Sequence, residues 1–328
     1  MRASSIGTAA FAILAAAGLA ACGGTADGPA TLRLAHVYEV SAPTHRCGAA
    51  RLADALAEGD GPRVQVFPTA QLGNEAELLE QLATGQLDMA IAGPSFLAAW
   101  HEPIGVFDAA YVFDDLDHQS AFARSELGQQ LWDGLREGHG MRVLDNWAYG
   151  ERHITARRPI RRPEDLRGFR LRLPHARVWQ ESGRALGASP MPIAFSEVYM
   201  ALQQGIADGQ ENPIVTIKTM GFHEVQTHLN LTGHSQSSTQ LVIAERVWER
   251  LGEAQQSVLL AAAREAGEGV RTCIETADRE ILQEWKKAGT PRIVDDVNRE
   301  AFRQRARRHF ASGFVWSDLY GRIQRREY

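Results

Sequence analysis

Two arginines occupy a short segment whose residue types alternate as they do in a β-strand. In the run FRLRLP (169–174), the apolar side chains fall on one face, and Arg170 and Arg172 fall on the other. Pro174 ends the run, so Arg172 lies at the end of the strand, where open α/β sheets bind ligands. A guanidinium there can bind a carboxylate through two parallel hydrogen bonds. A solvent-exposed strand arginine is the commoner case, so both interpretations stay open at this point.

Motifs that are typical of enzymes and metal sites are absent from the sequence. It contains no G-x-S-x-G, no G-x-x-x-x-G-K and no G-x-G-x-x-G. His223 and His228 flank a glutamate, but their spacing of five residues places them on different faces of a helix, where a zinc protease needs a spacing of four. No group of Cys and His has zinc spacing. We therefore expect no catalytic residue, no metal and no cofactor.

Length and charge narrow the class of protein. The 328 residues suffice for two lobes of medium size. The chain is 44% hydrophobic and 23% charged, as globular proteins are, and its net charge is −5. Because no long basic run occurs, nucleic acid is not an expected partner.

The N-terminus predicts export. Arg2 precedes an apolar stretch (6–17), which is too short and too rich in small residues for a membrane helix. The run LAAC (19–22) resembles a bacterial lipobox, in which the cysteine is lipidated after cleavage. We expect residues 1–21 to be a signal peptide, Cys22 to carry the lipid, and 22–30 to form a flexible tether. The alternative is an ordinary signal peptide that is cleaved near Ala21.

The two remaining cysteines are Cys47 and Cys273. An oxidising compartment permits a disulfide between them, and both could equally be buried thiols. The sequence leaves this choice open, since it cannot give their separation.

Strand and helix patterns alternate along the chain. Strands are expected at 32–36, 63–67, 87–92, 152–156, 169–173 and 239–244, and helices at 75–84, 196–204 and 254–286. The motif L-x-x-G-x-x-D occurs at 82–88 and again 120 residues later at 202–208. Both copies predict a helix that stops at the glycine, turns and leads into a strand. We therefore expect an α/β fold of two similar lobes.

The late strand at 239–244 suggests that the chain crosses back to the first lobe. Strands that cross between two lobes form a hinge, with a ligand cleft between the lobes. We expect lobe I to comprise 31–149 plus about 237–275, and lobe II to comprise 150–236 plus about 276–328.

Several long segments carry a family resemblance. They are FPTAQLG (67–73), GQLDMA (85–90), RPEDLRGFRLRLP (162–174), LGASP (186–190), FSEVYMALQQG (195–205), DGQENP (208–213) and EVQ (224–226). In this order they resemble the DctP family of solute-binding proteins of TRAP (tripartite ATP-independent periplasmic) transporters. The resemblance runs from about Leu32 to past Trp248.

The resemblance implies a periplasmic-binding-protein-like fold of two lobes. In such a fold each lobe is a mixed sheet flanked by helices, strands form the hinge, and a long helix braces both lobes. It implies carboxylate ligands, with Arg172 as the main carboxylate clamp, Arg152 as a second arginine near the ligand, and Asn212 as a side chain that steadies Arg172 and the carboxylate. Further positions that line the pocket in the family are His175, Phe195, Glu211 and His234.

Positions in the first lobe vary within the family and set its specificity. Here they are Val37, Tyr38, Glu75, Gly93, Phe96 and Trp147. Some sialic-acid binders carry charged residues where this chain has Gly93 and Phe96, which argues against sialic acid as the ligand. Glu75 could accept hydrogen bonds from ligand hydroxyl groups.

The expected function is capture of a small organic acid, such as a C4-dicarboxylate or a sugar acid, by a monomer that delivers it to the TRAP membrane subunits. The protein would lie outside the cytoplasmic membrane and be attached to it only through the lipid on Cys22. The alternatives are a binding lipoprotein for an ABC importer or a sensor, which the fold would allow, and an exported enzyme.

Overall fold

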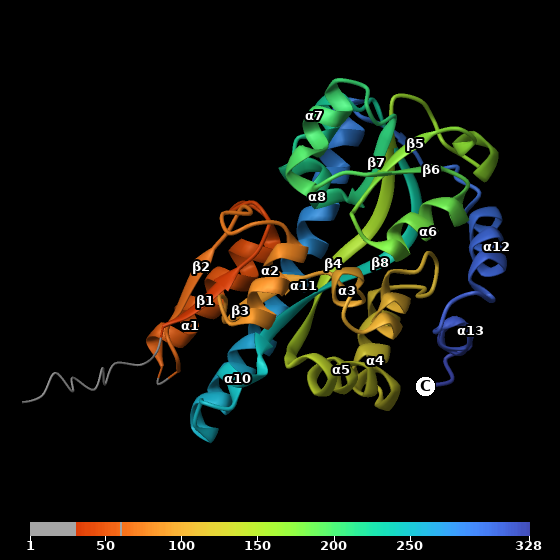
Figure 1. Ribbon diagram of the computed structural model, residues 1–328. Helices are drawn as coiled ribbons and strands as arrows, with labels where there is room; N and C mark the ends of the chain where they lie inside the picture. The colour runs from red at the N-terminus through yellow and green to blue at the C-terminus, as the bar shows by residue number, and fades with distance from the viewer. Residues whose placement is uncertain (1–30, 60) are drawn as a thin grey trace, which may run out of the picture.

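The computed structural model describes residues 31–59 and 61–328. The expected signal peptide, tether and Cys22 lie outside these residues. In the described part, one mixed sheet has the strand order β2-β1-β3-β8-β4-β7-β5-β6 (Figure 1). The short strand β9 pairs with β8. Its strands are β1 (Leu32–Ala35), β2 (Val64–Phe67), β3 (Met89–Ala92), β4 (Met141–Ala156), β5 (Arg170–Leu173), β6 (Ser189–Pro192), β7 (Gly209–Pro213), β8 (His228–Ala244) and β9 (Arg292–Val294).

Helices flank this sheet along its whole length. The α-helices are α1 (Ala50–Glu58), α2 (Glu75–Thr84), α3 (Pro94–Leu97), α4 (Leu116–Arg124), α5 (Glu126–His139), α6 (Arg177–Leu186), α7 (Val198–Gln203), α8 (Ile214–Thr219), α9 (Phe222–Val225), α10 (Glu245–Trp248), α11 (Glu253–Ala288), α12 (Arg299–Phe310) and α13 (Ser317–Gln324). A π-helix, η1 (Thr44–Ala49), precedes α1, and the 3-10 helices are η2 (Glu102–Asp108), η3 (Pro163–Leu166) and η4 (Phe195–Glu197). None of the helices in the described ranges is long and apolar enough to cross a membrane.

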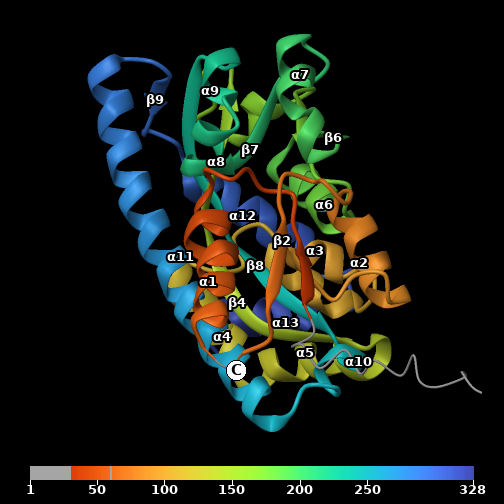
Figure 2. The ribbon, with the colours of Figure 1, turned by 90° about the vertical axis from the view of Figure 1, so that its left-hand side faces the viewer.

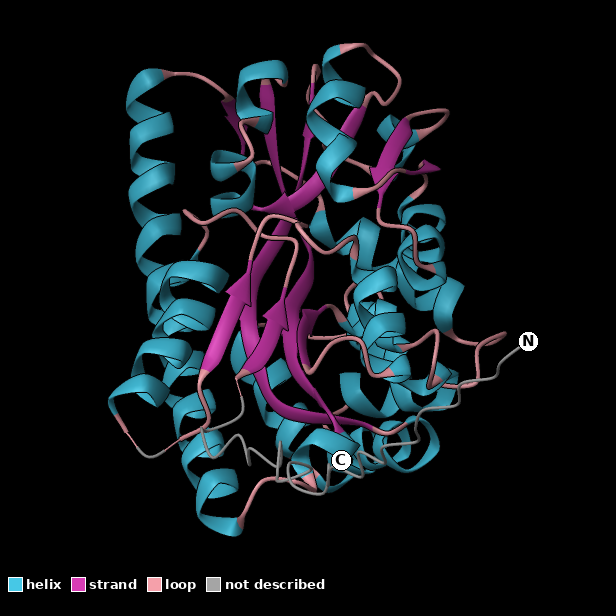
Figure 3. Ribbon diagram, turned by 60° about the vertical axis from the view of Figure 1, so that its left-hand side comes forward, coloured by secondary structure: helices cyan, strands magenta, loops and turns pink. Residues whose placement is uncertain are grey.

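The molecule has two lobes that share two long antiparallel strands. β4 has 16 residues and β8 has 17, and both run from one lobe into the other (Figure 3). We call the lobe with β1, β2 and β3 the first lobe and the lobe with β5, β6 and β7 the second lobe. Parallel pairs lie within each lobe, and antiparallel pairs join β3 to β8, β8 to β4 and β4 to β7. The expected two-lobe α/β fold with mixed sheets and crossing strands is therefore confirmed.

The crossing strands are longer than the sequence predicts. The segments 152–156 and 239–244 are only the ends of β4 and β8. Three register shifts interrupt the alternation of side chains along β4, between Val143 and Asp145, between Ala148 and Gly150, and after Arg152. Because strand prediction depends on uninterrupted alternation, such shifts hide the middle of a strand.

The helix α11 braces both lobes, as expected from residues 254–286. It has 36 residues, which corresponds to a length of about 54 Å, and lies along the side of both lobes (Figure 2). Small residues let it approach β4: a Cβ added to Gly267 would lie 2.7 Å from Cδ1 of Trp147. Cys273 on α11 forms a disulfide with Cys47 on η1, which settles the choice that the sequence leaves open.

The two copies of L-x-x-G-x-x-D have the same structure in the two lobes. Gly85 ends α2 with a φ of 89°, and Gly205 follows α7 with a φ of 70°, a conformation that glycine adopts without strain. Asp88 then accepts a hydrogen bond of 2.9 Å from the backbone N–H of Arg33 in β1. Asp208 accepts one of 2.8 Å from that of Arg170 in β5. The repeat therefore marks one helix-to-strand connection used twice.

The end of the chain contacts both lobes. α12 packs against α6 of the second lobe. The Tyr320 hydroxyl on α13 donates to the carbonyl of Ala110 at 2.9 Å, and the ring of Tyr328 stacks on that of His118 in α4. The C-terminal segment therefore links the lobes outside the crossing strands.

A partly buried carboxyl group connects α11 to the second lobe. Oδ1 of Asp278 accepts a hydrogen bond of 3.1 Å from the backbone N–H of Val215 in α8. Burial raises the pKa of Asp278 to about 7; the bond from Val215 opposes this rise, and the charge of Glu151 adds to it. An unfolded chain releases this proton near pH 3.8, so the folded chain holds the extra proton up to about pH 7. The contribution of Asp278 to stability therefore falls as the pH rises through this window.

We expect Asp278→Asn to raise the free energy of unfolding at pH 8 by about 1 kcal/mol, because the amide keeps the acceptor and removes the charge. The gain should shrink toward zero as the pH approaches 4. Urea denaturation between pH 4 and pH 8 measures it. Asp54→Asn, at an exposed aspartate on α1, is the matched control. A gain that is the same at every pH would contradict the assignment.

Candidate ligand-binding site

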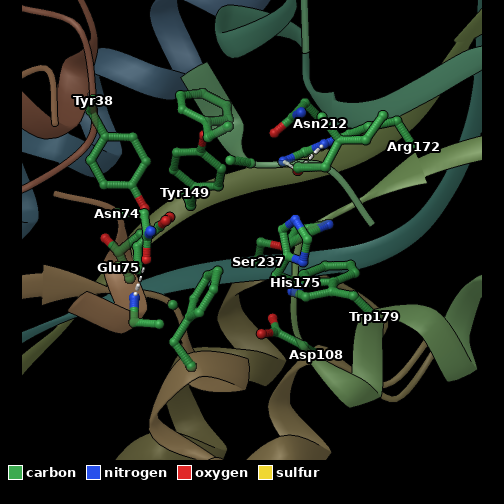
Figure 4. Close-up of a pocket in the computed structure, with 18 of the residues that line it drawn as sticks. Tyr38, Asn74, Glu75, Asp108, Tyr149, Arg172, His175, Trp179, Asn212 and Ser237 are labelled. Carbon is green, nitrogen blue, oxygen red and sulfur yellow. Dashed lines mark hydrogen bonds between the residues drawn. The ribbon is translucent and has the colours of Figure 1, made fainter. Parts of the chain in front are cut away.

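A cavity of about 410 Å³ lies between the lobes, where β1, β3 and β5 end (Figure 4). Its wall has three parts. The first lobe contributes Tyr38, Asn74, Glu75, Ala76, Gly93, Phe96 and Asp108. The second lobe contributes Arg172, Pro174, His175, Trp179, Ile193, Ala194, Phe195, Glu197 and Asn212. The crossing strands contribute Tyr149, Arg152, Ser237, Ser238 and Thr239.

Arg172 carries a buried positive charge in this wall, and the protein satisfies its hydrogen-bonding groups only in part. It is 1% exposed, and its Nε and one terminal nitrogen donate to the backbone carbonyl of Ile193 at 3.0 and 2.7 Å. Its other terminal nitrogen, Nη1, is buried and has no hydrogen-bond partner in the described part of the chain. Burial lowers the pKa of Arg172 to about 10; the charge of Glu211 opposes this, and that of Arg152 adds to it. The guanidinium thus stays charged at neutral pH and lacks a carboxylate.

Arg152 on β4 is also buried, but unlike Arg172 it has a carboxylate partner. It is 4% exposed and forms a bidentate ion pair with Glu211 on β7, including a bond of 2.8 Å to Oε1. Burial alone would lower its pKa, but the Glu211 carboxylate holds the pKa above its usual value. The guanidinium also lies over the ring of Trp179, 4.5 Å from its centre. Arg152 is therefore fixed and neutralised before any ligand arrives.

Aromatic rings close one side of the cavity. The ring of Tyr38 in the first lobe lies 5.3 Å from that of Tyr149 on β4 and 6.2 Å from that of Phe195 in the second lobe. Burial raises the pKa of the Tyr38 hydroxyl well above its usual value, so this group stays neutral. These rings exclude water while leaving polar groups at their edges.

Two carboxyl groups of the first lobe face the arginines. Glu75 begins α2, and Asp108 ends η2. Burial raises the pKa of Glu75, with Arg172 and Arg152 opposing the shift. Burial also raises the pKa of Asp108 to about 6, against hydrogen bonds from Ser95. Both groups are therefore weaker acids than carboxyls in water, and neither forms an ion pair with Arg172.

Nine of the thirteen residues expected to bind the ligand line the cavity. They are Arg172, Arg152, Asn212, His175, Phe195, Glu75, Tyr38, Gly93 and Phe96. The other four do not form its wall, for reasons that differ between the lobes.

Val37 and Trp147 belong to the hydrophobic core and are not among the residues that line the cavity. Trp147 is fully buried against α11, where its indole N–H donates to the carbonyl of Ala263 at 3.0 Å. Val37 is 5% exposed, next to Tyr38, which lines the cavity. Both residues lie in the bend that follows β1, where Tyr38 lines the cavity and Val37 packs in the core.

Glu211 and His234 form a layer behind the wall. Glu211 is fully buried, and His234 approaches its carboxylate at 3.2 Å. Asn212 lines the cavity, but its side chain bonds to Arg152 at 3.0 Å and to Gln210 at 2.7 Å. No hydrogen bond between Asn212 and Arg172 is present, so the expected contact between them is replaced by one to Arg152.

Sequence reasoning misses several residues of the wall. One feature of the sequence could have indicated Asp108: it is the only charged residue in the apolar run IGVFDAAYVF (104–113). Trp179 follows the strand-ending Pro174 by five residues and has no pattern of its own. Ser237 and Ser238 lie in the polar middle of β8, which the sequence does not predict as a strand. Thr239 lies in the expected strand at 239–244, but nothing in the pattern marks it as part of the wall.

Chemically, the cavity suits a small anion that carries further polar groups. It offers a buried positive charge on one side and hydrogen-bond acceptors on the other. No group of three His, Cys, Asp or Glu that could hold a metal ion occurs within the described ranges.

Comparisons with known proteins agree with this geometry. The family model of bacterial extracellular solute-binding proteins, family 7 (DctP), matches residues 34–314. The sialic acid-binding periplasmic protein SiaP of Vibrio cholerae is 34% identical over 255 residues, which are 77% of this chain and 79% of that protein.

Solved structures of the same family have the same fold. A TRAP periplasmic solute binding protein of Roseobacter denitrificans with bound L-galactonate is 32% identical and superposes with a TM-score of 0.83, covering 90% of this chain and 98% of that one. A second protein of that organism, with bound 3-deoxy-D-manno-oct-2-ulosonic acid, is 29% identical, with a TM-score of 0.85 and coverage of 91% and 99%. The chain therefore belongs to the DctP family of TRAP periplasmic solute-binding proteins.

Proposed function

We propose that this chain captures a small organic acid in the cavity between its lobes and delivers it, chemically unchanged, to the membrane subunits of a TRAP transporter. The observation that carries the proposal is the buried Nη1 of Arg172, which has no partner in the described chain. A ligand carboxylate supplies both the missing acceptor and the missing negative charge. The organic acids bound in the two Roseobacter structures support a ligand of this class.

Arg152 supports the same proposal from the neighbouring strand. Because Glu211 already neutralises it, Arg152 adds hydrogen-bond donors near the carboxylate without adding a second unpaired charge. Arg172 is thus the arginine of the wall without a carboxylate partner in the described chain, and a ligand carboxylate would pair with it.

We expect Arg172→Ala to weaken binding by about 3–5 kcal/mol, because the ligand charge would remain buried without its partner. This corresponds to roughly a hundredfold to several-thousandfold loss of affinity. Arg172→Lys keeps the charge but not the planar fork, so it should still lose much of the affinity. Isothermal titration calorimetry with an acid found in a thermal-shift screen measures both.

Arg170→Ala is the matched control for this experiment. Arg170 lies on the same strand, but its side chain is 45% exposed and pairs with Asp208 at 2.6 Å, outside the cavity. Its loss should change affinity less than about threefold. If folded Arg172→Ala binds as tightly as Arg170→Ala, Arg172 is not the clamp.

We further propose the lobe boundaries 31–149 plus about 237–275 and 150–236 plus about 276–328, with the lobes closing on the ligand. Each lobe supplies part of the cavity wall, so a ligand that contacts both walls favours the closed arrangement.

Small-angle X-ray scattering should therefore give a smaller radius of gyration with the acid bound than without it. Folded Arg172→Ala at the same acid concentration is the control and should keep the radius of the unliganded protein. An unchanged radius at calorimetrically verified saturation would contradict closure.

We also propose that the protein is a monomer outside the cytoplasmic membrane, held to it by lipid on Cys22. The support is the run LAAC (19–22) directly after the apolar stretch.

Cys22→Ser should release soluble protein or leave the signal peptide uncleaved, because the lipid attachment site is lost. Membrane fractionation and the mass of the mature N-terminus measure this outcome. A Cys22→Ser protein that is still processed and still sediments with membranes would show that the anchor lies elsewhere.

A further inference from the structure

Asp108 occupies a position that the carboxylate clamp does not explain. It is the last residue of η2 and 1% exposed, and it lines the cavity from the first lobe. Figure 4 shows it beside Trp179, on the other side of the cavity from Arg172 and Asn212. An aspartate in an apolar segment is costly to bury, so its presence in this wall calls for a partner.

Only one of its two carboxyl oxygens has a hydrogen-bond partner in residues 31–59 and 61–328. Oδ2 accepts hydrogen bonds from the backbone N–H of Ser95, at 2.9 Å, and from the Ser95 hydroxyl. Oδ1 is buried and has no hydrogen-bond partner in the described chain. A buried polar atom without a partner destabilises the empty site, and a ligand donor would remove that cost.

Three residues of the cavity wall carry such atoms. Besides Asp108 Oδ1, the buried atoms without partners include Arg172 Nη1 and the Thr239 hydroxyl, and all three residues line the cavity. Arg172 needs an acceptor, Asp108 in its ionised form needs a donor, and a hydroxyl can use either. The three atoms together match a carboxylate that is joined to hydroxyl-bearing carbons.

The charges of the first lobe argue against a second carboxylate on the ligand. The acids of its wall are Glu75 and Asp108, whereas Arg152, Arg172 and His175 come from β4 and the second lobe. A second carboxylate placed near Glu75 and Asp108 would meet like charges and no cation of its own. A hydroxyl group meets acceptors instead.

A hydroxyl also fits Asp108 better than an ammonium group does. A hydroxyl can donate to the ionised carboxyl or accept from the protonated one, whereas an ammonium needs the ionised form. Burial raises the pKa of Asp108 to about 6, so both forms occur in mildly acidic solution, and only a hydroxyl suits both.

We propose that Asp108 is a specificity residue that binds a hydroxyl group of a sugar acid with a single carboxylate, which Arg172 holds at the other side of the cavity. This inference rests on the proposed capture of an organic acid. It adds a residue and a ligand class: aldonates rather than C4-dicarboxylates.

Calorimetry with three aldonates (L-galactonate, L-gulonate and D-erythronate) and with succinate tests the ligand class. At least one aldonate should bind, and succinate should bind at least about tenfold more weakly. The class is wrong if succinate matches the best aldonate, if no aldonate binds, or if L-glutamate, which carries an ammonium group, binds better than every aldonate.

Asp108→Asn tests the residue. Its amide oxygen can accept from Ser95, which leaves an NH₂ group in place of the acceptor Oδ1. At neutral pH, above the Asp108 pKa of about 6, the ligand hydroxyl donates to the ionised carboxylate, and the NH₂ group cannot accept that bond, so affinity for the best aldonate should fall at least about tenfold. Among monodeoxy forms of that aldonate, one should lose less than about threefold on the same substitution, because it lacks the hydroxyl that Asp108 binds; this non-additivity identifies the pair.

Controls separate this inference from the proposed function. Asp54→Asn, on the surface of α1, should bind like the wild type. If Arg172→Ala abolishes binding but Asp108→Asn changes affinity less than threefold for every probe, the role of Asp108 is refuted and the clamp stands. If Arg172→Ala binds normally, the proposed function fails first.

Should Asp108→Asn not fold, Asp108→Ser, whose hydroxyl still faces Ser95, replaces it under the same criteria.

Discussion

The positive charge of Arg172 is buried, and no carboxylate in the part of the chain that the structure describes forms an ion pair with it. Taking a guanidinium out of water costs several kcal/mol, and the single carbonyl of Ile193 satisfies only part of its hydrogen-bonding capacity. At Arg152, the ion pair with both carboxylate oxygens of Glu211 offsets the cost of removing the guanidinium from water. The fold thus builds two buried arginines side by side and gives only one of them an acidic partner, which leaves the other for a ligand.

The remaining elements keep this arrangement in place and divide its parts between the lobes. β5 carries Arg172, and the crossing strands β4 and β8 carry Arg152 and Thr239 between the lobes. α11, tied by the disulfide of Cys47 and Cys273, runs along both lobes and supports the crossing strands through Trp147. Because acceptors such as Asp108 belong to the first lobe and Arg172 to the second, a ligand that satisfies both also joins the lobes.

Local chemistry made much of this predictable from the sequence. Alternation and Pro174 located Arg172 at the end of a strand, the repeated L-x-x-G-x-x-D revealed two similar lobes, and the long helical pattern marked α11. What alternation could not reveal was the middle of β4 and β8, where register shifts and polar residues break the pattern. Trp147, which the family resemblance places near the ligand, packs against α11 instead, and the direction of a side chain on β4 depends on those shifts. Asp108 was missed because its role depends on burial and on contacts with Ser95, which are long-range properties of the folded chain.

The most direct test is a crystal structure of the chain with the tightest-binding acid from a ligand screen. We predict a carboxylate oxygen of the ligand within about 3.2 Å of Nη1 of Arg172, between the two lobes and beside the pair of Arg152 and Glu211. A ligand whose carboxylate lies elsewhere, with Nη1 of Arg172 still lacking an acceptor, would contradict the account.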